Sequence, residues 1–187
     1  MNKLIILDRD GVINLDSDAF VKNAEEWIPI NNSIKAIARL YKSGYQIAVA
    51  TNQSGLGREY FSQQDLDDMH AKMVRLVEAE GGQFATIKYC PHKPDAGCDC
   101  RKPLPGLIDQ IKQELQLDNL DGAYMVGDSL RDLQAGEARG CKAVLVRTGK
   151  GEKTLAANEG LDNALVFSEL SEFTDWLLTQ DAERRIA

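Results

Sequence analysis

The chain has 187 residues, of which 43% are hydrophobic and 27% are charged, and its formal net charge is -7 at pH 7. This length and composition predict one globular domain over residues 1–187 with a single sizeable core. The net charge argues against a general nucleic-acid binder, and no apolar run is long enough to cross a membrane. Residues 1–3 lead directly into the first strand-like segment, so we expect no signal peptide and a cytoplasmic location.

Strand-like and helix-like segments alternate along the chain. Ser62 and Asp65 form a capping-box pattern that opens a helix, which Leu66, Met69 and Met73 continue at helical spacing. The polar tail, 181–187, is expected to fray. In chain order we expect a strand at 3–7, a helix at 33–43, a strand at 45–50, a helix at 62–80, a strand at 84–89, a helix at 107–117, a strand at 123–126, a helix at 129–139, a strand at 142–147, a short helix, a strand at 164–167 and a helix at 169–179.

This alternation predicts an α/β fold with a mainly parallel sheet covered by helices on both faces. In such sheets, ligands bind beyond the carboxyl ends of the strands, where the strand order reverses. We therefore expect the residues that carry chemistry to follow the strands directly.

Polar residues follow four of the predicted strands. They are Asp8 and Asp10 after the first, Thr51, Asn52, Gln53 and Ser54 after the second, Arg101 and Lys102 beyond the third, and Asp128 and Asp132 after the fourth. Two carboxylates at the end of a buried strand are costly unless a cation holds them. Carboxylates, a hydroxyl and two cationic side chains at one sheet edge suit phosphoryl transfer, in which positioned charges stabilise the transition state.

Each group has a role in that chemistry. Asp8 and Asp128, with the backbone carbonyl of Asp10, are candidate Mg²⁺ ligands. A free oxygen of Asp8 is the candidate nucleophile, and Asp10 is the candidate acid and base. Thr51 and Lys102 are expected to bind the phosphoryl oxygens, while Arg101 offers a fork for a bidentate contact. Asp132 is either an exposed acid in the first turn of a helix or a residue that orients Lys102.

The four segments resemble the motifs of the haloacid-dehalogenase-like (HAD) phosphatases, which are Asp-x-Asp, a strand-end Thr, a Lys and Gly-Asp-x-x-x-Asp. The resemblance spans residues 4–132 and implies a Rossmann-like, three-layer α/β/α HAD fold. The segments that join Asp10, Thr51 and Lys102 are filled by predicted elements, so we expect no large cap domain.

A cysteine-rich loop follows the third strand. Cys90, His92, Cys98 and Cys100 are the ligand types of a structural zinc site, and one short loop, 90–102, can wrap a single ion. Free thiols in a flexible loop are the alternative. Zinc would make the segment that aims Arg101 and Lys102 rigid. His70 is interpreted as a helix residue without a functional role, and Cys141 as a small buried hydrophobe.

The capless, zinc-bearing pattern resembles the D,D-heptose 1,7-bisphosphate phosphatase family over residues 3–150. The matching segments are Asp8-Arg9-Asp10-Gly11-Val12-Ile13-Asn14, Thr51-Asn52-Gln53-Ser54-Gly55, Cys98-Asp99-Cys100-Arg101-Lys102-Pro103 and Val146-Arg147-Thr148-Gly149. The resemblance implies hydrolysis of the 7-phosphate of D-glycero-D-manno-heptose 1,7-bisphosphate, on the route to ADP-heptose for lipopolysaccharide core. It also implies substrate contacts from Asp16, Ser17, Asp18, Ala19, Thr51, Asn52, Gln53, Ser54 and Arg101.

Other interpretations stay open at this point. The spacer between His92 and Cys98 is short, as in the histidinol-phosphate phosphatases, which share the loop. A zinc-stabilised binding module that has lost catalysis would explain the cysteines without Asp10 or Lys102. A phosphatase acting on nucleic-acid 3′ ends is disfavoured by the net charge. The anomer of the sugar is not specified by the sequence, and a monomer is the default expectation.

Overall fold

The computed structural model describes residues 2–186, so Met1 and Ala187 of the predicted domain lie outside the described residues. Six parallel strands form one sheet in the order β3-β2-β1-β4-β5-β6. The strands are β1 (Leu4–Leu7), β2 (Gln46–Asn52), β3 (Thr86–Cys90), β4 (Tyr124–Gly127), β5 (Lys142–Val146) and β6 (Leu165–Phe167). The strand order reverses at β1, which lies between β2 and β4 at the centre of the sheet. All four residues of β1 are fully buried, because helices cover both faces there.

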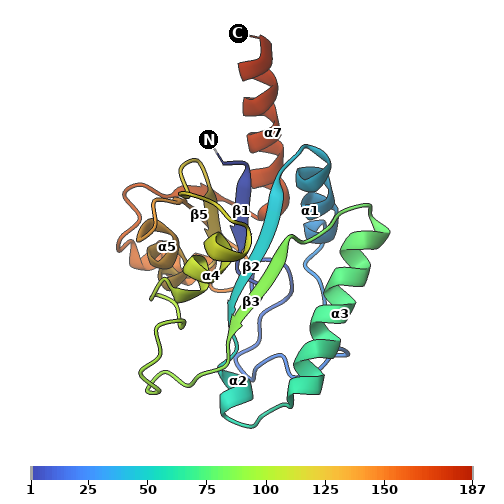
Figure 1. Cartoon of the computed structure of the whole chain (residues 1–187), viewed down its shortest axis with the longest axis vertical. Helices are drawn as coiled ribbons and strands as arrows, with labels where there is room; N and C mark the ends of the chain where they lie inside the picture. The colour runs from blue at the N-terminus through green and yellow to red at the C-terminus, as the bar shows by residue number, and fades with distance from the viewer. Residues whose placement is uncertain (1, 187) are drawn as a thin grey trace.

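Helices cover both faces of the sheet, which confirms the predicted three-layer α/β/α fold (Figure 1). One face carries α1 (Ser33–Lys42), α3 (Gln63–Ala79) and α7 (Leu170–Ile186), and the other carries α4 (Gly106–Glu114), α5 (Leu130–Glu137) and α6 (Gly151–Ala157). Alternate residues of β1 therefore enter different cores. Ile5 and Leu7 pack with α1, α3 and α7, whereas Leu4 and Ile6 pack with α4 and α5.

Helix α3 is the element that later bears on the site. Its capping box is present, since the Ser62 side chain accepts a hydrogen bond from the amide of Asp65, whose carboxylate accepts one from the amide of Ser62. Leu66, Met69 and Met73 are buried, as their spacing predicts. The buried stripe fixes the rotation of α3 over the sheet and so decides which of its polar residues face inwards.

Most elements differ by one to three residues at their ends from the sequence-based expectation, and three differences bear on the description of the molecule. Strand β2 extends to Asn52, so Thr51 lies inside the strand rather than after it. A single helical turn, α2 (Ser54–Gly57), follows β2. It was not predicted from the sequence because two of its four residues are glycines, which have a low helix propensity. Helix α7 continues to Ile186 through the tail expected to fray, and Asp181 anchors it by accepting a hydrogen bond of 2.8 Å from the Tyr45 hydroxyl.

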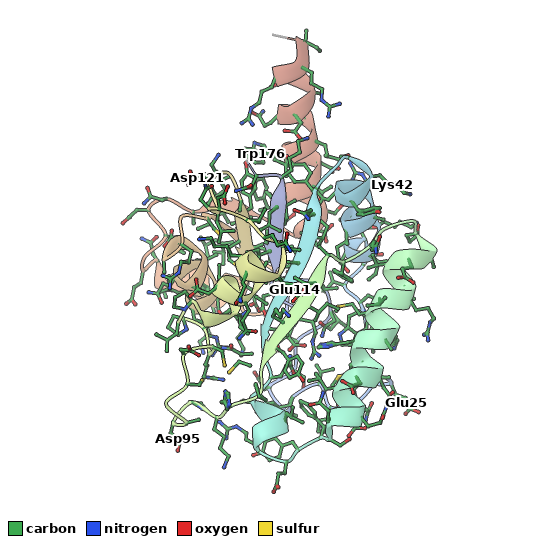
Figure 2. All side chains as sticks on the ribbon, viewed as in Figure 1. Glu25, Lys42, Asp95, Glu114, Asp121 and Trp176 are labelled. Atoms are coloured by element: carbon green, nitrogen blue, oxygen red, sulfur yellow. The ribbon has the colours of Figure 1, made fainter. Side chains whose placement is uncertain are left out.

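The carboxyl ends of the strands lie at the bottom of Figure 1, together with α2 and the cysteine loop, while α7 projects at the opposite end. Figure 2 shows the same separation: Asp95, in the cysteine loop, lies at the lower edge, far from Lys42 and Asp121 near the amino ends of the strands. Between Asp10 and Lys102 the described elements are α1, β2, α2, α3 and β3, and none forms a cap domain. None of the helices within residues 2–186 combines the length and the apolar character that a membrane span needs.

Candidate active site

The four predicted strand ends meet at the carboxyl edge of the sheet, around a pocket of about 180 Å³. Sheet pairing explains why the first and fourth of them lie side by side: β1 pairs with β4, and the amide of Asp8 donates to the Val126 carbonyl at 2.9 Å. Most of the predicted site residues line the pocket, namely Asp8, Asp10, Asp16, Ser17, Asp18, Asn52, Gln53, Ser54, Arg101, Lys102, Asp128 and Asp132.

Two predicted residues do not line this pocket. Ala19 is absent from its wall, although its neighbours Asp18 and Phe20 contribute to it. Thr51 is buried inside β2, and its hydroxyl accepts a hydrogen bond of 2.8 Å from Gln53. Arg131 and Lys150 line the pocket and were missed. Arg131 stands within the Gly127–Asp132 motif, and that placement is the signal that could have flagged it.

Asp8 and Asp128 are buried carboxylates, and each has an oxygen within 4.8 Å of the other. Burial, followed by the charge of Asp132, raises the pKa of Asp8 to about 7, although Lys102 opposes the shift. Burial and the charge of Asp8 raise the pKa of Asp128 to about 8. Neighbouring buried carboxylates of this kind ionise together only when a cation compensates them. The donor set therefore fits a hard divalent ion such as Mg²⁺.

Backbone atoms of two loops lie very close to the Asp128 carboxylate. The amide of Lys150 donates to Asp128 Oδ2 at 2.9 Å, which holds the side chain from the loop after β5. Gly11, with φ of 86°, approaches from the loop after β1; a Cβ atom there would lie 2.0 Å from Asp128 Oδ2. Gly149 makes a similar approach, with its own Cβ position 2.3 Å from the same oxygen. Side chains at either glycine would displace this carboxylate.

Lys102 is almost fully buried, and its ammonium group has three oxygen partners, one for each N–H. Its Nζ donates to Asp132 Oδ1 at 2.7 Å, to Asp8 Oδ1 at 2.9 Å and to the Ala50 carbonyl at 2.7 Å. Burial opposes its charge, but Asp132 and Asp8 outweigh that penalty and raise the pKa of Lys102. The lysine therefore stays cationic beside Asp8.

Asp132 is 1% exposed, so the alternative of an exposed first-turn acid is wrong. One of its oxygens accepts from Lys102, and the other accepts from the amide and hydroxyl of Ser129 at 3.1 and 3.0 Å. The second set of bonds is the capping box of α5. Asp132 thus ties the orientation of Lys102 to the start of a helix, which favours the other interpretation of this residue.

Asp10 lies at the mouth of the pocket, with a side chain that is 23% exposed. It accepts hydrogen bonds from Asn14 at 2.8 Å, from Gln53 at 2.9 Å and from Arg9, which binds both of its oxygens. Burial opposes ionisation, but Arg9 and these hydrogen bonds outweigh it and lower the pKa of Asp10. Arg9 was missed as a site residue. A cation between two carboxylates in an otherwise apolar segment is the signal that points to it.

The cysteine loop brings its four predicted ligands together. Single ligand atoms of Cys90, His92, Cys98 and Cys100 all lie within 4.8 Å of one another, and the three cysteines form no disulfide. His92 Nδ1 lies 3.4 Å from Cys90 Sγ and 3.3 Å from Cys100 Sγ. Three sulfurs and one imidazole nitrogen in this arrangement fit tetrahedral zinc. Burial raises the pKa of Cys90 and Cys100, so a cation is needed for both to be thiolates.

The loop continues directly into the two predicted cations. Asn52, at the end of β2, clamps the Lys102 backbone: its Oδ1 accepts from the Lys102 amide at 3.0 Å and its Nδ2 donates to the Lys102 carbonyl at 3.1 Å. Arg101 Nη1 is buried without a hydrogen-bond partner among the described residues. Burial, followed by the charges of Arg131 and Arg58, lowers the pKa of Arg101. Clustered guanidinium groups with a free donor beside the pocket favour an anionic ligand.

Comparison with known sequences points in the same direction as the geometry. A HAD-hydrolase-like family model matches residues 99–173. A Pseudomonas putida protein named D-glycero-beta-D-manno-heptose-1,7-bisphosphate 7-phosphatase is 52% identical over 90% of this chain and 95% of its own length. A protein of the same name from Neisseria meningitidis serogroup A is 50% identical over 96% of this chain and 97% of its own.

Solved structures similar to this chain include phosphatases of the same kind as the sequence relatives. The D,D-heptose 1,7-bisphosphate phosphatase of B. bronchiseptica, complexed with magnesium and phosphate, superposes with a TM-score of 0.92. It is 48% identical in sequence, and the match covers 96% of this chain and 99% of that one. The corresponding phosphatase of Burkholderia thailandensis superposes with a TM-score of 0.74 at 40% identity, over 95% of this chain and 99% of that one.

Proposed function

The chain belongs to the D-glycero-D-manno-heptose-1,7-bisphosphate 7-phosphatase family of HAD hydrolases, and we propose that it removes the 7-phosphate of this sugar bisphosphate, leaving heptose 1-phosphate. One observation carries the proposal: Asp8, Asp128 and Lys102 converge at the carboxyl edge of the sheet, beside a pocket whose wall includes Arg101 and Arg131. That pocket offers an acidic end for a metal and a basic end for a second phosphate.

Asp8 is the proposed nucleophile. One of its oxygens attacks the phosphorus, the bond to the sugar C7 oxygen breaks, and an aspartyl-phosphate forms. Lys102 neutralises charge on Asp8 and on the incoming phosphoryl oxygens, and the Asp132 contact keeps its ammonium aimed there. Mg²⁺ held by Asp8, Asp128 and the Asp10 carbonyl supplies further charge stabilisation when it is bound.

Asp10 is the proposed acid and base. In the resting site it is ionised, because Arg9 outweighs the effect of burial on its pKa. An anionic phosphate adds like charge beside it, which raises that pKa and favours the protonated form. Asp10 then donates its proton to the departing sugar oxygen. In the second half-reaction it takes a proton from water, whose oxygen attacks phosphorus and releases Asp8 and inorganic phosphate.

The open pocket places substrate recognition in surrounding loops. Asp16, Ser17 and Asp18 line it from the loop after β1, and Ser54 lines it from the start of α2. Arg101 and Arg131 are the proposed contacts for the 1-phosphate. We assign the β anomer as the preferred substrate on the strength of the relatives' names. A monomer in the cytoplasm stays a prediction from the sequence.

Steady-state phosphate release from a substrate panel tests the proposal. The panel contains the β and α anomers of heptose 1,7-bisphosphate and histidinol phosphate, each with Mg²⁺, and Asp8→Asn serves as the near-isosteric control. The β anomer should show the highest kcat/KM, and Asp8→Asn should lose at least about a thousandfold in kcat while staying folded. A preference for histidinol phosphate would reject the heptose assignment, and no release from any substrate would favour a non-catalytic binding module.

A further inference from the structure

Arg9 is a fully buried cation that the proposed reaction does not use directly. Its guanidinium has five N–H donors and no acceptor. Nε and Nη2 donate to Asp10 at 3.1 and 2.9 Å, and Nη2 also contacts Gln53 Oε1 at 3.3 Å. These contacts provide acceptors for Nε and Nη2 of the guanidinium, on the side of Asp10 and Gln53. Nη1 points the other way, towards helix α3, and a buried cationic donor there requires an acceptor of its own.

His70 supplies that acceptor. Its Nε2 lies 3.3 Å from Arg9 Nη1, and the other contact of Nη1 is Met69 Sδ at 3.9 Å, which is a weak acceptor. Because the guanidinium has no lone pair, the contact to His70 exists only if Nε2 accepts. The ring must therefore be neutral, with its proton on Nδ1. Burial and the Arg9 charge lower the pKa of His70 to about 4, which agrees with this state.

The contact belongs to a chain of side chains that ends at the pocket. His70 contacts Arg9, Arg9 contacts both oxygens of Asp10, and Gln53 donates to Asp10 at 2.9 Å and to Thr51 at 2.8 Å. His70 comes from α3, whose buried stripe packs on the sheet independently of the site. The helix therefore provides a fixed point against which the Arg9–Asp10 pair is oriented.

We propose that His70 is a positioning residue whose neutral ring holds the Arg9 guanidinium so that Arg9 aims the Asp10 carboxylate at the reacting oxygen. The inference rests on the proposed role of Asp10 as acid and base. It assigns a function to a histidine that does not line the pocket. Without His70, Nη1 keeps only the weak acceptor Met69 Sδ and the guanidinium shifts, so Asp10 departs from its productive geometry.

Two substitutions separate this role from simple packing. His70→Leu removes the acceptor, and His70→Gln keeps one, because its amide oxygen can occupy the position of Nε2. Met73→Leu is the matched control, since Met73 lies in the same buried stripe of α3 and is not among the described hydrogen-bond partners of Arg9 Nη1, which are Met69 and His70. We expect kcat to fall about tenfold in His70→Leu with KM changed less than about twofold. His70→Gln should recover kcat to within about twofold of the native enzyme, and Met73→Leu should leave it unchanged.

A spectroscopic readout tests the contact without any turnover. The chain contains two histidines, so ¹⁵N spectra of the histidine-labelled protein show two rings, and His70→Gln assigns them. We expect His70 to be the Nδ1–H tautomer at neutral pH, with Nε2 unprotonated.

The kinetic and spectroscopic results together decide whether His70 positions Arg9. A protonated Nε2, or native kcat in folded His70→Leu, would overturn the positioning role. An equal loss of kcat in His70→Leu and Met73→Leu would show that packing alone matters. If the native enzyme releases no phosphate while the tautomer is as expected, the proposed function fails and the contact stands.

Discussion

Lys102 Nζ lies 2.7 Å from Asp132 Oδ1, and both side chains are 1% exposed. Removing one partner of such a pair leaves an uncompensated charge in the protein interior. Asp132 belongs to the first turn of α5. The position of the Lys102 ammonium group beside Asp8 therefore depends on where α5 begins.

Replacing Asp132 should therefore destabilise the protein. We expect Asp132→Asn to lower the free energy of unfolding by about 3 kcal/mol, because Lys102 keeps only Asp8 as an ionic partner. Urea denaturation measures the change. Asp109→Asn is the control, since it breaks an exposed ion pair with Arg139, which solvent screens, and its effect should be much smaller. Equal effects of the two substitutions would contradict the importance of burial.

Gly11 should be required for activity, because its backbone lies close to the Asp128 carboxylate. Gly11→Ala places a Cβ atom against Asp128 Oδ2 and should lower kcat/KM at least about tenfold and weaken Mg²⁺ binding. Gly44→Ala is matched in backbone strain, because φ is 91° there and 86° at Gly11, but within residues 2–186 no atom beyond its chain neighbours lies within 4 Å of its Cβ position. Gly44→Ala should cost about 1 kcal/mol of stability and keep full activity. Similar kinetics for the two variants would show that strain, rather than contact with Asp128, is responsible.

The stability of the metal-free protein should fall as the pH rises. The pKa values of Asp8 and Asp128 are about 7 and about 8 in the folded protein, above the value of 3.8 for a free aspartate. Between these limits the folded state retains protons that the unfolded chain has lost, so raising the pH favours unfolding. Mg²⁺ competes with the same protons, and the rise in Tm that it causes should increase from about pH 5 to about pH 8. Thermal melts of the zinc-loaded protein with and without added Mg²⁺ test this, and a Mg²⁺ effect independent of pH would contradict it.

Zinc and magnesium should have separable effects. Removing zinc is expected to lower Tm and to speed hydrogen exchange in residues 90–102, whereas removing Mg²⁺ should abolish turnover and leave the fold intact. Cys98→Ser should lose the metal, as measured by elemental analysis. Cys141→Ser should keep it, because Cys141 is buried apart from the four clustered ligands. Full stability and activity of zinc-free protein would contradict a structural role.

Much of this architecture could be predicted from local sequence patterns. The apolar run Leu4–Leu7 and the alternation of elements were enough for the parallel sheet, because a fully buried strand has few alternatives. The strand-end rule then brought Asp8, Lys102 and Asp128 to one edge, although they are far apart in the chain. The cysteine cluster needed no tertiary knowledge, since its ligands lie within one loop.

The contacts that depend on how helices rotate over the sheet could not be predicted. His70 looked like an ordinary helix residue, and its meeting with Arg9 requires the packing of α3 against β1. The burial of Asp132 depends in the same way on where α5 begins relative to Lys102. The length of α7 was misjudged because the Tyr45–Asp181 hydrogen bond joins residues that are 136 positions apart in the chain.

The central position of β1 in the sheet has a consequence for biosynthesis. The zinc ligands lie within a single loop, but Asp128 follows a strand that leaves the ribosome long after Asp8, and the two meet only when β4 docks beside β1. Local loops close at a lower entropic cost than distant ones. A nascent chain that ends before β4 therefore contains all four proposed zinc ligands but still lacks Asp128, one of the two carboxylates proposed for magnesium, so the residues for the two ions become complete at successive stages of synthesis.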